Sequence, residues 1–425
     1  MIKILNYRAL QEKIFERQED AAAVSDIVSK IIADIRNRKD AALYEYTEKF
    51  DKARLSSLIV SEEEFKEAEL LLEEDFKEVI KRAAANIREF HEKQIRQGFE
   101  IRKEDGIVIG QKITPIERVG LYVPGGTASY PSTVLMDAIP AKLAGCRRIV
   151  IATPPNKDGK ISPAILVAAK IAGVDTVYKM GGAQAIAALA YGTESVAPVD
   201  KIVGPGNAFV AEAKRQVFGL VSIDMIAGPS EILIIADEKS NPRHVAADLL
   251  SQAEHDKMAS AVLVTDSPSL ATAVQAEVEL QLSRLPRMEI ARASIESNGK
   301  IIVADDFEEV IKVSNRIAPE HLELMVDNPF DYLDRIENAG SIFMGRYCPE
   351  SLGDYFAGTN HTLPTSGTAR FSSPLSVDDF VKKSQYTFYT EKALRKVYRD
   401  VERFAEQEGL SAHARSATVR FSEEI

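Results

Sequence analysis

The feature that most constrains the fold is a regular alternation of short apolar segments with Gly/Pro turns and helix-like segments, beginning at Arg118. Helices are predicted between the apolar segments, for example at residues 132–144 and 208–217. Parallel strands need a helical crossover between them, so this alternation predicts a doubly wound parallel sheet covered by helices. The predicted strands are residues 119–123, 148–152, 176–180 and 201–204.

A second α/β stretch and two helical segments complete the predicted fold. Residues 21–103 show apolar positions at helical spacing, and the chain is again charged and helix-like from Val377. We therefore expect an α/β protein with two Rossmann-like, doubly wound domains, a helical N-terminal segment that packs on the second sheet, and a helical C-terminal tail. The strands predicted for the second sheet are residues 231–236, 261–265, 300–303, 322–326 and 340–344.

Composition limits the function classes. The chain has 425 residues, 45% of them hydrophobic, which suffices for more than one domain. Its net charge of −11 comes without a basic stripe and argues against a nucleic-acid partner. No apolar run reaches membrane-spanning length, and the first residues lack a signal peptide's hydrophobic segment, so no membrane association is expected. Two cysteines exclude a disulfide framework and favour a reducing cytoplasm.

Three glycine-rich turns follow predicted strands, at residues 124–126, 181–182 and 204–207. Small residues there let backbone N–H groups at a helix start approach a phosphate. None matches the G-x-G-x-x-G fingerprint, and an ordinary tight turn explains any one of them equally well. Three such turns at one sheet edge favour a nucleotide crevice, where Tyr122 can stack on a ring.

A metal site is indicated by Gln252 and His255, three residues apart in a helix-like segment. This spacing places both side chains on one helix face. The dispersed residues Asp354 and His413 complete a set of oxygen and nitrogen donors that suits zinc or a similar borderline ion.

The adjacent residues Glu320 and His321 are candidates for general acid–base chemistry, although a solvent-exposed turn also accounts for them. His361 lies in a polar loop, and Ser230 offers a hydroxyl at the mouth of a strand. Cys146 is a conceivable nucleophile for aldehyde oxidation. It precedes an apolar strand without catalytic neighbours, so an inert core thiol is favoured, and Cys348 suits a reactive loop thiol better.

Together these motifs resemble the histidinol dehydrogenase family. The resemblance covers nearly the whole chain, in order, and several of its motifs are highly specific. The matching segments are residues 120–126 (GLYVPGG), 181–189 (GGAQAIAAL), 204–216 (GPGNAFVAEAKRQ), 227–231 (AGPSE), 248–255 (DLLSQAEH), 319–322 (PEHL), 358–361 (GTNH) and 410–413 (LSAH).

The resemblance implies a zinc-dependent cytoplasmic homodimer with shared active sites. It would oxidise L-histidinol through the aldehyde to L-histidine, using two NAD as co-substrate, in the last steps of histidine biosynthesis. One Zn²⁺ per subunit would be held by Gln252, His255, Asp354 and His413 of the partner subunit. These four positions also match substrate contacts.

The resemblance further assigns roles to individual positions. Tyr122, Gln184 and Asn207 match NAD contacts, and Glu320 with His321 matches the acid–base pair. The remaining substrate-contact positions are Ser230, His321, His361 and Glu408.

Domain boundaries follow from the motifs and the resemblance together. Residues 1–24 are expected to form a helical extension, and 25–121 with 236–376 an α/β domain that carries the metal and catalytic motifs. Residues 122–235 are expected to form the NAD-binding domain, and 377–425 a helical tail that reaches the partner subunit.

Two other functions stay open at this point. One is a zinc- or NAD-linked dehydrogenase acting on a different amino alcohol. The other is a non-catalytic metal-binding protein of the same fold, against which the intact Glu320–His321 pair argues.

Overall fold

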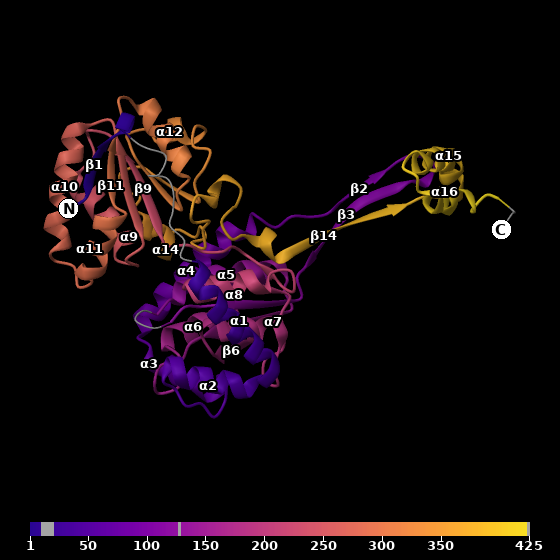
Figure 1. The fold of residues 1–425 in the computed structure, drawn as a ribbon, viewed down its shortest axis with the longest axis horizontal. Coiled ribbons are helices and arrows are strands. Elements are labelled where there is room, and N and C mark those ends of the chain that lie inside the picture. Colours follow the sequence, from indigo (N-terminus) through magenta and orange to yellow (C-terminus); the bar gives the residue numbers. More distant parts are fainter. Residues whose placement is uncertain (10–20, 126–128, 423–425) are drawn as a thin grey trace. The chain divides into compact units, whose positions relative to one another are not determined.

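The computed structural model describes residues 1–9, 21–125 and 129–422, so Gly126 of the first glycine-rich turn lies outside the described residues. The chain forms two compact units (Figure 1). Met1–Gln94 with Ile116–Phe380 is called the core unit, and Ile95–Pro115 with Val381–Ile425 the hairpin unit. Both sheets of the core unit are parallel and alternate with helices, which confirms the predicted α/β class.

The first sheet of the core unit has the strand order β6-β5-β4-β7-β8. Strands β4 to β7 are buried on both faces along most of their length, as expected for a parallel sheet between helices. The strands are β4 (Arg118–Tyr122), β5 (Arg148–Thr153), β6 (Thr176–Lys179), β7 (Lys201–Val203) and β8 (Ser222–Ile223), and the helices are α5 (Pro131–Ala144), α6 (Pro163–Ala172), α7 (Gly182–Tyr191) and α8 (Ala208–Val217).

The second sheet has the order β1-β11-β10-β9-β12-β13. Edge strand β1 (Lys3–Asn6) pairs with β11. The sequence analysis predicted residues 1–24 to be a helical extension, so this part of the prediction is wrong. The other strands are β9 (Glu231–Ala236), β10 (Ser260–Thr265), β11 (Lys300–Val303), β12 (His321–Met325) and β13 (Ser341–Met344), and the helices are α9 (Pro242–Ala253), α10 (Pro268–Leu282), α11 (Met288–Ser297), α12 (Phe307–Ile317), α13 (Phe330–Leu333) and α14 (Glu350–Tyr355).

The N-terminal helices pack on the first sheet's helices, whereas the sequence analysis expected them on the second sheet. Helix α1 contacts α7 and α8, α3 contacts α6, and α4 contacts α5. The reason lies in α7, whose residues Ala183 to Ala190 are buried on every side of the helix. The side of α7 that faces away from the sheet must therefore also be covered by another helix. The apolar face of α1, with Val28 and Ile35, supplies it. These helices are α1 (Ala21–Arg38), α2 (Asp40–Asp51), α3 (Glu62–Leu71) and α4 (Glu74–Glu92).

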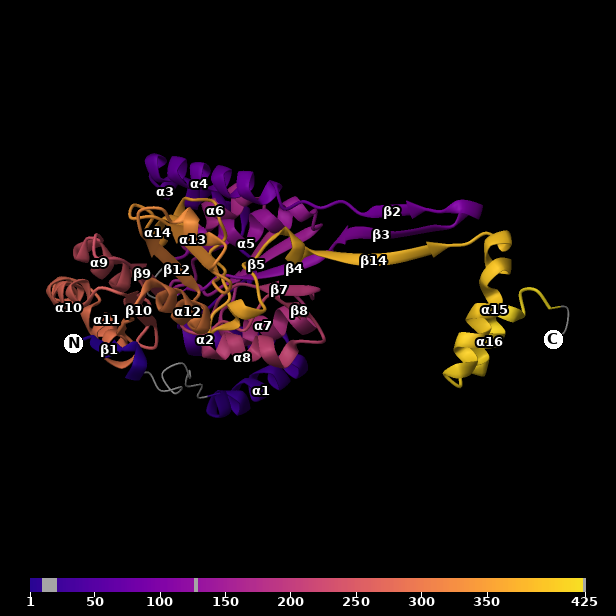
Figure 2. The ribbon, with the colours of Figure 1, turned by 90° about the horizontal axis from the view of Figure 1, so that it is seen from above.

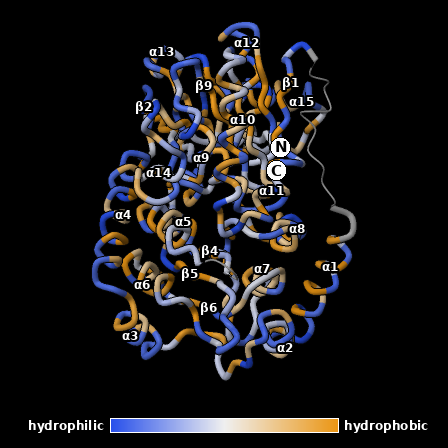
Figure 3. The backbone as a smooth tube through the Cα atoms, turned by 90° about the vertical axis from the view of Figure 1, so that its left-hand side faces the viewer, coloured by the Kyte–Doolittle hydropathy of each residue, from blue (hydrophilic) through white to orange (hydrophobic). Residues whose placement is uncertain are grey.

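The domain boundaries expected from the sequence stay predictions. Hydrophobic and hydrophilic residues alternate along α1 and α2, as one-sided helix burial requires (Figure 3).

The hairpin unit contains an antiparallel sheet with the order β14-β3-β2. Its strands lead to helices α15 (Glu391–Gln407) and α16 (Ser411–Thr418) (Figure 2). The sequence analysis predicted helix through residue 103 and again from 377, but residues 99–102 and 381–388 are strands. Strand β14 (Val381–Phe388) pairs along its whole length with the distant β3 (Val108–Pro115), and β2 (Phe99–Arg102) pairs on the other side of β3. Because the strand conformation of these residues depends on a partner strand far away in the sequence, their local sequence pattern does not indicate a strand.

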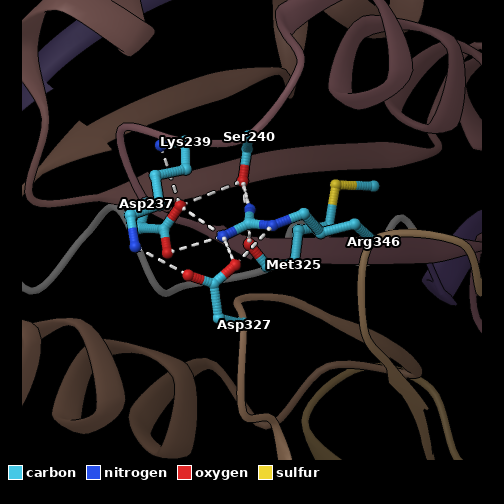
Figure 4. Close-up of polar contacts among 6 residues, drawn as sticks. All are labelled: Asp237, Lys239, Ser240, Met325, Asp327 and Arg346. Carbon is cyan, nitrogen blue, oxygen red and sulfur yellow. Dashed lines mark hydrogen bonds and ion pairs between the residues drawn. The ribbon is translucent and has the colours of Figure 1, made fainter.

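The half-buried Arg346 connects the residues at the carboxyl ends of β9, β12 and β13. Arg346 donates to both carboxylate oxygens of Asp237 at 2.9 Å and to the Met325 carbonyl at 2.6 Å (Figure 4). It also contacts Asp327 at 3.0 Å, and Asp327 pairs with Lys239. Charged side chains thus occupy the edge of this sheet at which α/β proteins usually bind ligands.

Within residues 1–9, 21–125 and 129–422, no helix has both the length and the apolar character needed to cross a membrane.

The Cys146 thiol is expected to resist alkylation in the folded protein. It is buried, and this burial raises its pKa to about 12, so only about one thiol in ten thousand is ionised at pH 8. Iodoacetamide at that pH should label the more exposed Cys348, and Cys146 only after unfolding, as read from peptide masses. Equal labelling of both cysteines in the native protein would contradict this.

Candidate active site

Glu320 and His321 lie at the amino end of β12, next to the amino end of β9. His321 begins β12 and Glu231 begins the adjacent β9. The Glu231 N–H donates to Glu320 Oε2 at 2.8 Å, and the Glu231 carbonyl lies 2.9 Å from His321 Nδ1. The backbone of one strand therefore orients both side chains of the other.

His321 is arranged as a base. A carbonyl can only accept, so Nδ1 must carry the proton, and the lone pair is left on Nε2. Nε2 is buried and has no hydrogen-bond partner among the described residues. Burial also holds the pKa of His321 below its usual value, which favours the neutral ring. A neutral imidazole with a free Nε2 suits removal of a hydroxyl proton.

Glu320 is a separate group and not a relay to His321. Its Oε2 lies 3.6 Å from His321 Nδ1, beyond hydrogen-bond range. Burial, together with the negative charge of nearby Glu231, raises the pKa of Glu320 well above its usual value. A carboxylate with a raised pKa is a stronger base once ionised, which suits proton abstraction from water.

Two carboxyl groups on α14 face His321. Glu350 and Asp354 are four residues apart and lie on one face of the helix. Ligand atoms of Glu350, Asp354 and His321 all lie within 4.8 Å of one another. The sequence analysis named Asp354 but missed Glu350, which the i,i+4 spacing of the two acids could have revealed.

His361 joins this cluster from the loop after α14. Its Nδ1 lies 3.6 Å from Asp354 Oδ1 and 3.1 Å from the Asp354 carbonyl, and its Nε2 lies 3.2 Å from Thr133 Oγ1 of α5. Burial lowers the pKa of His361 to about 4, so the ring is neutral near pH 7.

Gln252 and His255 come from the end of α9. Gln252 is buried in the last turn, and neither its Oε1 nor its Nε2 has a partner within the described part of the chain. His255 is half-buried just beyond the helix, and its charge would act on both His321 and His361. An unpaired buried amide is costly, so this site fits a ligand that Gln252 would bind.

The three predicted dinucleotide residues lie at one edge of the first sheet. Tyr122 ends β4, and its hydroxyl accepts from the Gly182 N–H at 3.0 Å. Gln184 is buried in the first turn of α7, and Asn207 caps α8 through its side chain. Their strands β4, β6 and β7 present carboxyl ends to this edge, the usual location of a nucleotide.

A buried ion pair fixes the third glycine-rich turn. Lys214 Nζ donates to the Gly204 carbonyl at 3.0 Å and pairs with Asp224, whose carboxylate accepts from the Gly204 N–H at 2.7 Å. Gly204 has φ +113°, and a Cβ there would lie 2.1 Å from the Tyr122 carbonyl oxygen, so only glycine fits. The sequence analysis missed this pair because its members come from different elements.

Comparison with known proteins settles the family. A family model described as histidinol dehydrogenase matches residues 15–421. The chain belongs to the histidinol dehydrogenase family.

Histidinol dehydrogenases from several bacteria match over almost their full length. That of Clostridium acetobutylicum is 56% identical, covering 99% of both chains, and that of Bacillus subtilis is 55% identical, covering 92% of both. The crystal structure of histidinol dehydrogenase from Elizabethkingia anophelis matches with a TM-score of 0.94 at 43% identity, covering 99% of this chain and 98% of that one. The resemblance and the predicted dehydrogenase class are confirmed.

Two residues that the histidinol dehydrogenase resemblance assigned to the site belong to the hairpin unit. Glu408 caps the C-terminus of α15, and His413 lies in α16; both are exposed. Ser230 is half-buried in the core unit directly before β9, and its carbonyl accepts from the Ser260 N–H at 2.9 Å. Within the core unit the contacts described above gather Glu320, His321, Asp354 and His361. The individual roles of all these residues stay predictions.

Proposed function

We propose that this protein oxidises L-histidinol through L-histidinaldehyde to L-histidine in two NAD-linked steps, the last of histidine biosynthesis, in the cytoplasm. The observation that carries the proposal is His321, a buried neutral imidazole with a free Nε2 beside two carboxyl groups. Membership of the histidinol dehydrogenase family supplies the substrate class.

The proton transfers can be assigned to residues of this chain. In the first step His321 Nε2 accepts the hydroxyl proton as hydride leaves the carbinol carbon for NAD. Glu320, as a carboxylate, then accepts a proton from the water that adds to the aldehyde. After His321 has released its first proton to solvent, it accepts the proton of the hydrate in the second step, as the second hydride leaves. The sum is one histidinol and one water converted to histidine, with two NADH and three protons released.

The proposed metal ligands are Gln252, His255, Asp354 and His413 of the partner subunit. Their mixture of oxygen and nitrogen donors suits Zn²⁺, and the unpaired amide of Gln252 supports a ligand there. When bound, the ion would hold the amine and imidazole nitrogens of histidinol as a template. Zinc at one ion per subunit is thus part of the proposal.

A homodimer with shared sites is also proposed. The hairpin unit carries exposed apolar side chains on α15 and at both ends of α16, among them Phe404, Leu410 and Val419. Such residues on a small unit favour burial against another surface. His413 and Glu408 would then serve the other subunit's site.

One assay tests the function: NADH formed per histidinol consumed, with and without a chelator. Two NADH per histidinol, lost on chelation and restored by zinc, is the expected result. No NADH at all would favour a metal-binding protein without catalysis. Faster turnover of another amino alcohol would favour a different dehydrogenase.

Replacing Glu320 with glutamine should impair oxidation of the aldehyde far more than oxidation of the alcohol. Glutamine keeps the acceptor for the Glu231 N–H but cannot take a proton from water. Loss of a general base costs about 10²–10⁴-fold, expected for oxidation of supplied histidinaldehyde and not for the first NADH formed from histidinol in a single turnover. Equal losses in these two half-reactions would give Glu320 a structural role instead.

A further inference from the structure

We propose that Glu323, paired with Asp248, is a positioning residue that sets the spacing of α9 and α14, the two helices that carry metal-ligand candidates. Neither residue touches substrate or metal in the proposed scheme. This inference rests on the zinc-dependent function proposed above.

Glu323 lies on the same face of β12 as His321, because side chains alternate along a strand. It is fully buried. Its Oε1 accepts from the Glu350 N–H at 2.7 Å, at the first residue of α14. The preceding Pro349 offers no side-chain cap, so Glu323 supplies the acceptor that orients this helix start.

The Glu323 carboxyl group also contacts α9, through a side-chain hydrogen bond with the carboxyl group of Asp248. Apart from that carboxyl group, the buried Oε2 of Glu323 has no partner among the described residues. Two carboxyl groups can share a hydrogen bond only if one carries a proton. Burial raises the pKa of both carboxyl groups, that of Glu323 well above its usual value and that of Asp248 to about 7, so the pair can hold the shared proton at neutral pH.

On both α9 and α14, the residue that Glu323 contacts lies one helical turn before a candidate metal ligand. Asp248 is one helical turn before Gln252 on the same face of α9. Glu350, whose N–H Glu323 accepts, is one turn before Asp354 on α14. A single side chain in the middle strand therefore links the helix of Gln252 to the helix of Asp354.

Two further contacts show that α14 is held tightly. Ser251 of α9 donates to Glu350 Oε2 at 2.9 Å. A Cβ at Gly353 would lie 2.4 Å from the Phe343 ring of β13, so the helix packs directly on that strand. These two contacts keep α14 on its neighbours, so loss of the Glu323 bonds would release its first turn, which would tilt against α9 and misplace Asp354.

The test measures zinc affinity by chelator competition, independently of activity. Glu323→Gln keeps both bonds, since its amide oxygen accepts from Glu350 and its NH₂ donates to Asp248. We expect zinc affinity within about threefold of wild type. Glu323→Leu loses both bonds and should weaken zinc binding by about 10–100-fold, the range for partners that orient metal ligands.

Val264→Ala is the matched control, because it opens a cavity in buried β10 without touching α9 or α14. It should lower the melting temperature and leave zinc affinity unchanged. Asp248→Ala removes the pair from the other side and should weaken zinc binding as Glu323→Leu does. It serves as the decisive variant if Glu323→Leu does not fold.

Zinc affinity of the wild-type protein distinguishes failure of the proposed function from failure of the positioning role. A wild-type protein that binds no zinc would overturn the proposed function. A wild-type protein that binds zinc, with Glu323→Leu or Asp248→Ala binding equally well, would overturn the positioning role alone. Equal losses in Glu323→Gln and Glu323→Leu would do the same.

Discussion

His255→Ala and Asp354→Ala are each expected to abolish zinc retention and activity while the subunit stays folded. Both positions lie at the surface of a large core formed without them, so the metal should not be required for folding. Activity should fall by more than the roughly 10–100-fold that loss of a supporting partner costs. Zinc content after gel filtration, histidinol-dependent NADH formation and the melting temperature check the three parts.

Glu350→Gln provides the comparison variant for this prediction. Glu350 lies in the same cluster as Asp354 but is outside the proposed ligand set. It should keep stoichiometric zinc. Zinc loss in Glu350→Gln would add this residue to the ligands, and stoichiometric zinc in the His255 or Asp354 variant would remove that residue from them.

Mixing inactive His413→Ala chains with inactive His321→Ala chains should restore activity, up to about a quarter of wild type. If His413 serves the other subunit's site, a heterodimer holds one site with both lesions and one with neither. Random pairing makes half of the dimers heterodimers, and half of their sites are intact, so about a quarter of all sites work. Turnover after dissociation and reassociation measures the recovery.

The control mixes His321→Ala with Asp354→Ala, two lesions in the core unit. Each heterodimer site then carries one lesion, and no recovery is expected. Absence of recovery with His413→Ala in verified heterodimers would mean that His413 serves its own subunit.

Strands β4 to β7 and β9 to β13 of the parallel sheets could be predicted because their hydrophobic pattern is local. Runs such as residues 148–152 and 231–236 are buried on both faces, so their sequence is apolar throughout. Strands β1, β2 and β14 could not, since short or exposed strands depend on a distant partner. The packing of a further helix on α7 could have been predicted, because α7 is apolar on all sides and cannot face solvent.

In the candidate site, too, residues with a local sequence pattern could be predicted and residues that depend on distant neighbours could not. Residues in distinctive local motifs, such as Glu320–His321 and Gln252–His255, were found from sequence. Glu350, Glu323 and the Lys214–Asp224 pair were missed, because their importance depends on burial and on neighbours from other elements. An isolated Glu in a sequence normally indicates a solvated surface, and only the fold shows that Glu323 is buried.

The Arg346 network lies at the carboxyl end of the second sheet, whereas the candidate catalytic residues lie at the opposite, amino end of β12. The carboxyl end is therefore a place for attachment. Phe330, exposed at the start of α13, offers a position for a dye, a tether or a peptide tag on the side of the sheet away from the chemistry. Immobilisation through that point should leave substrate access open.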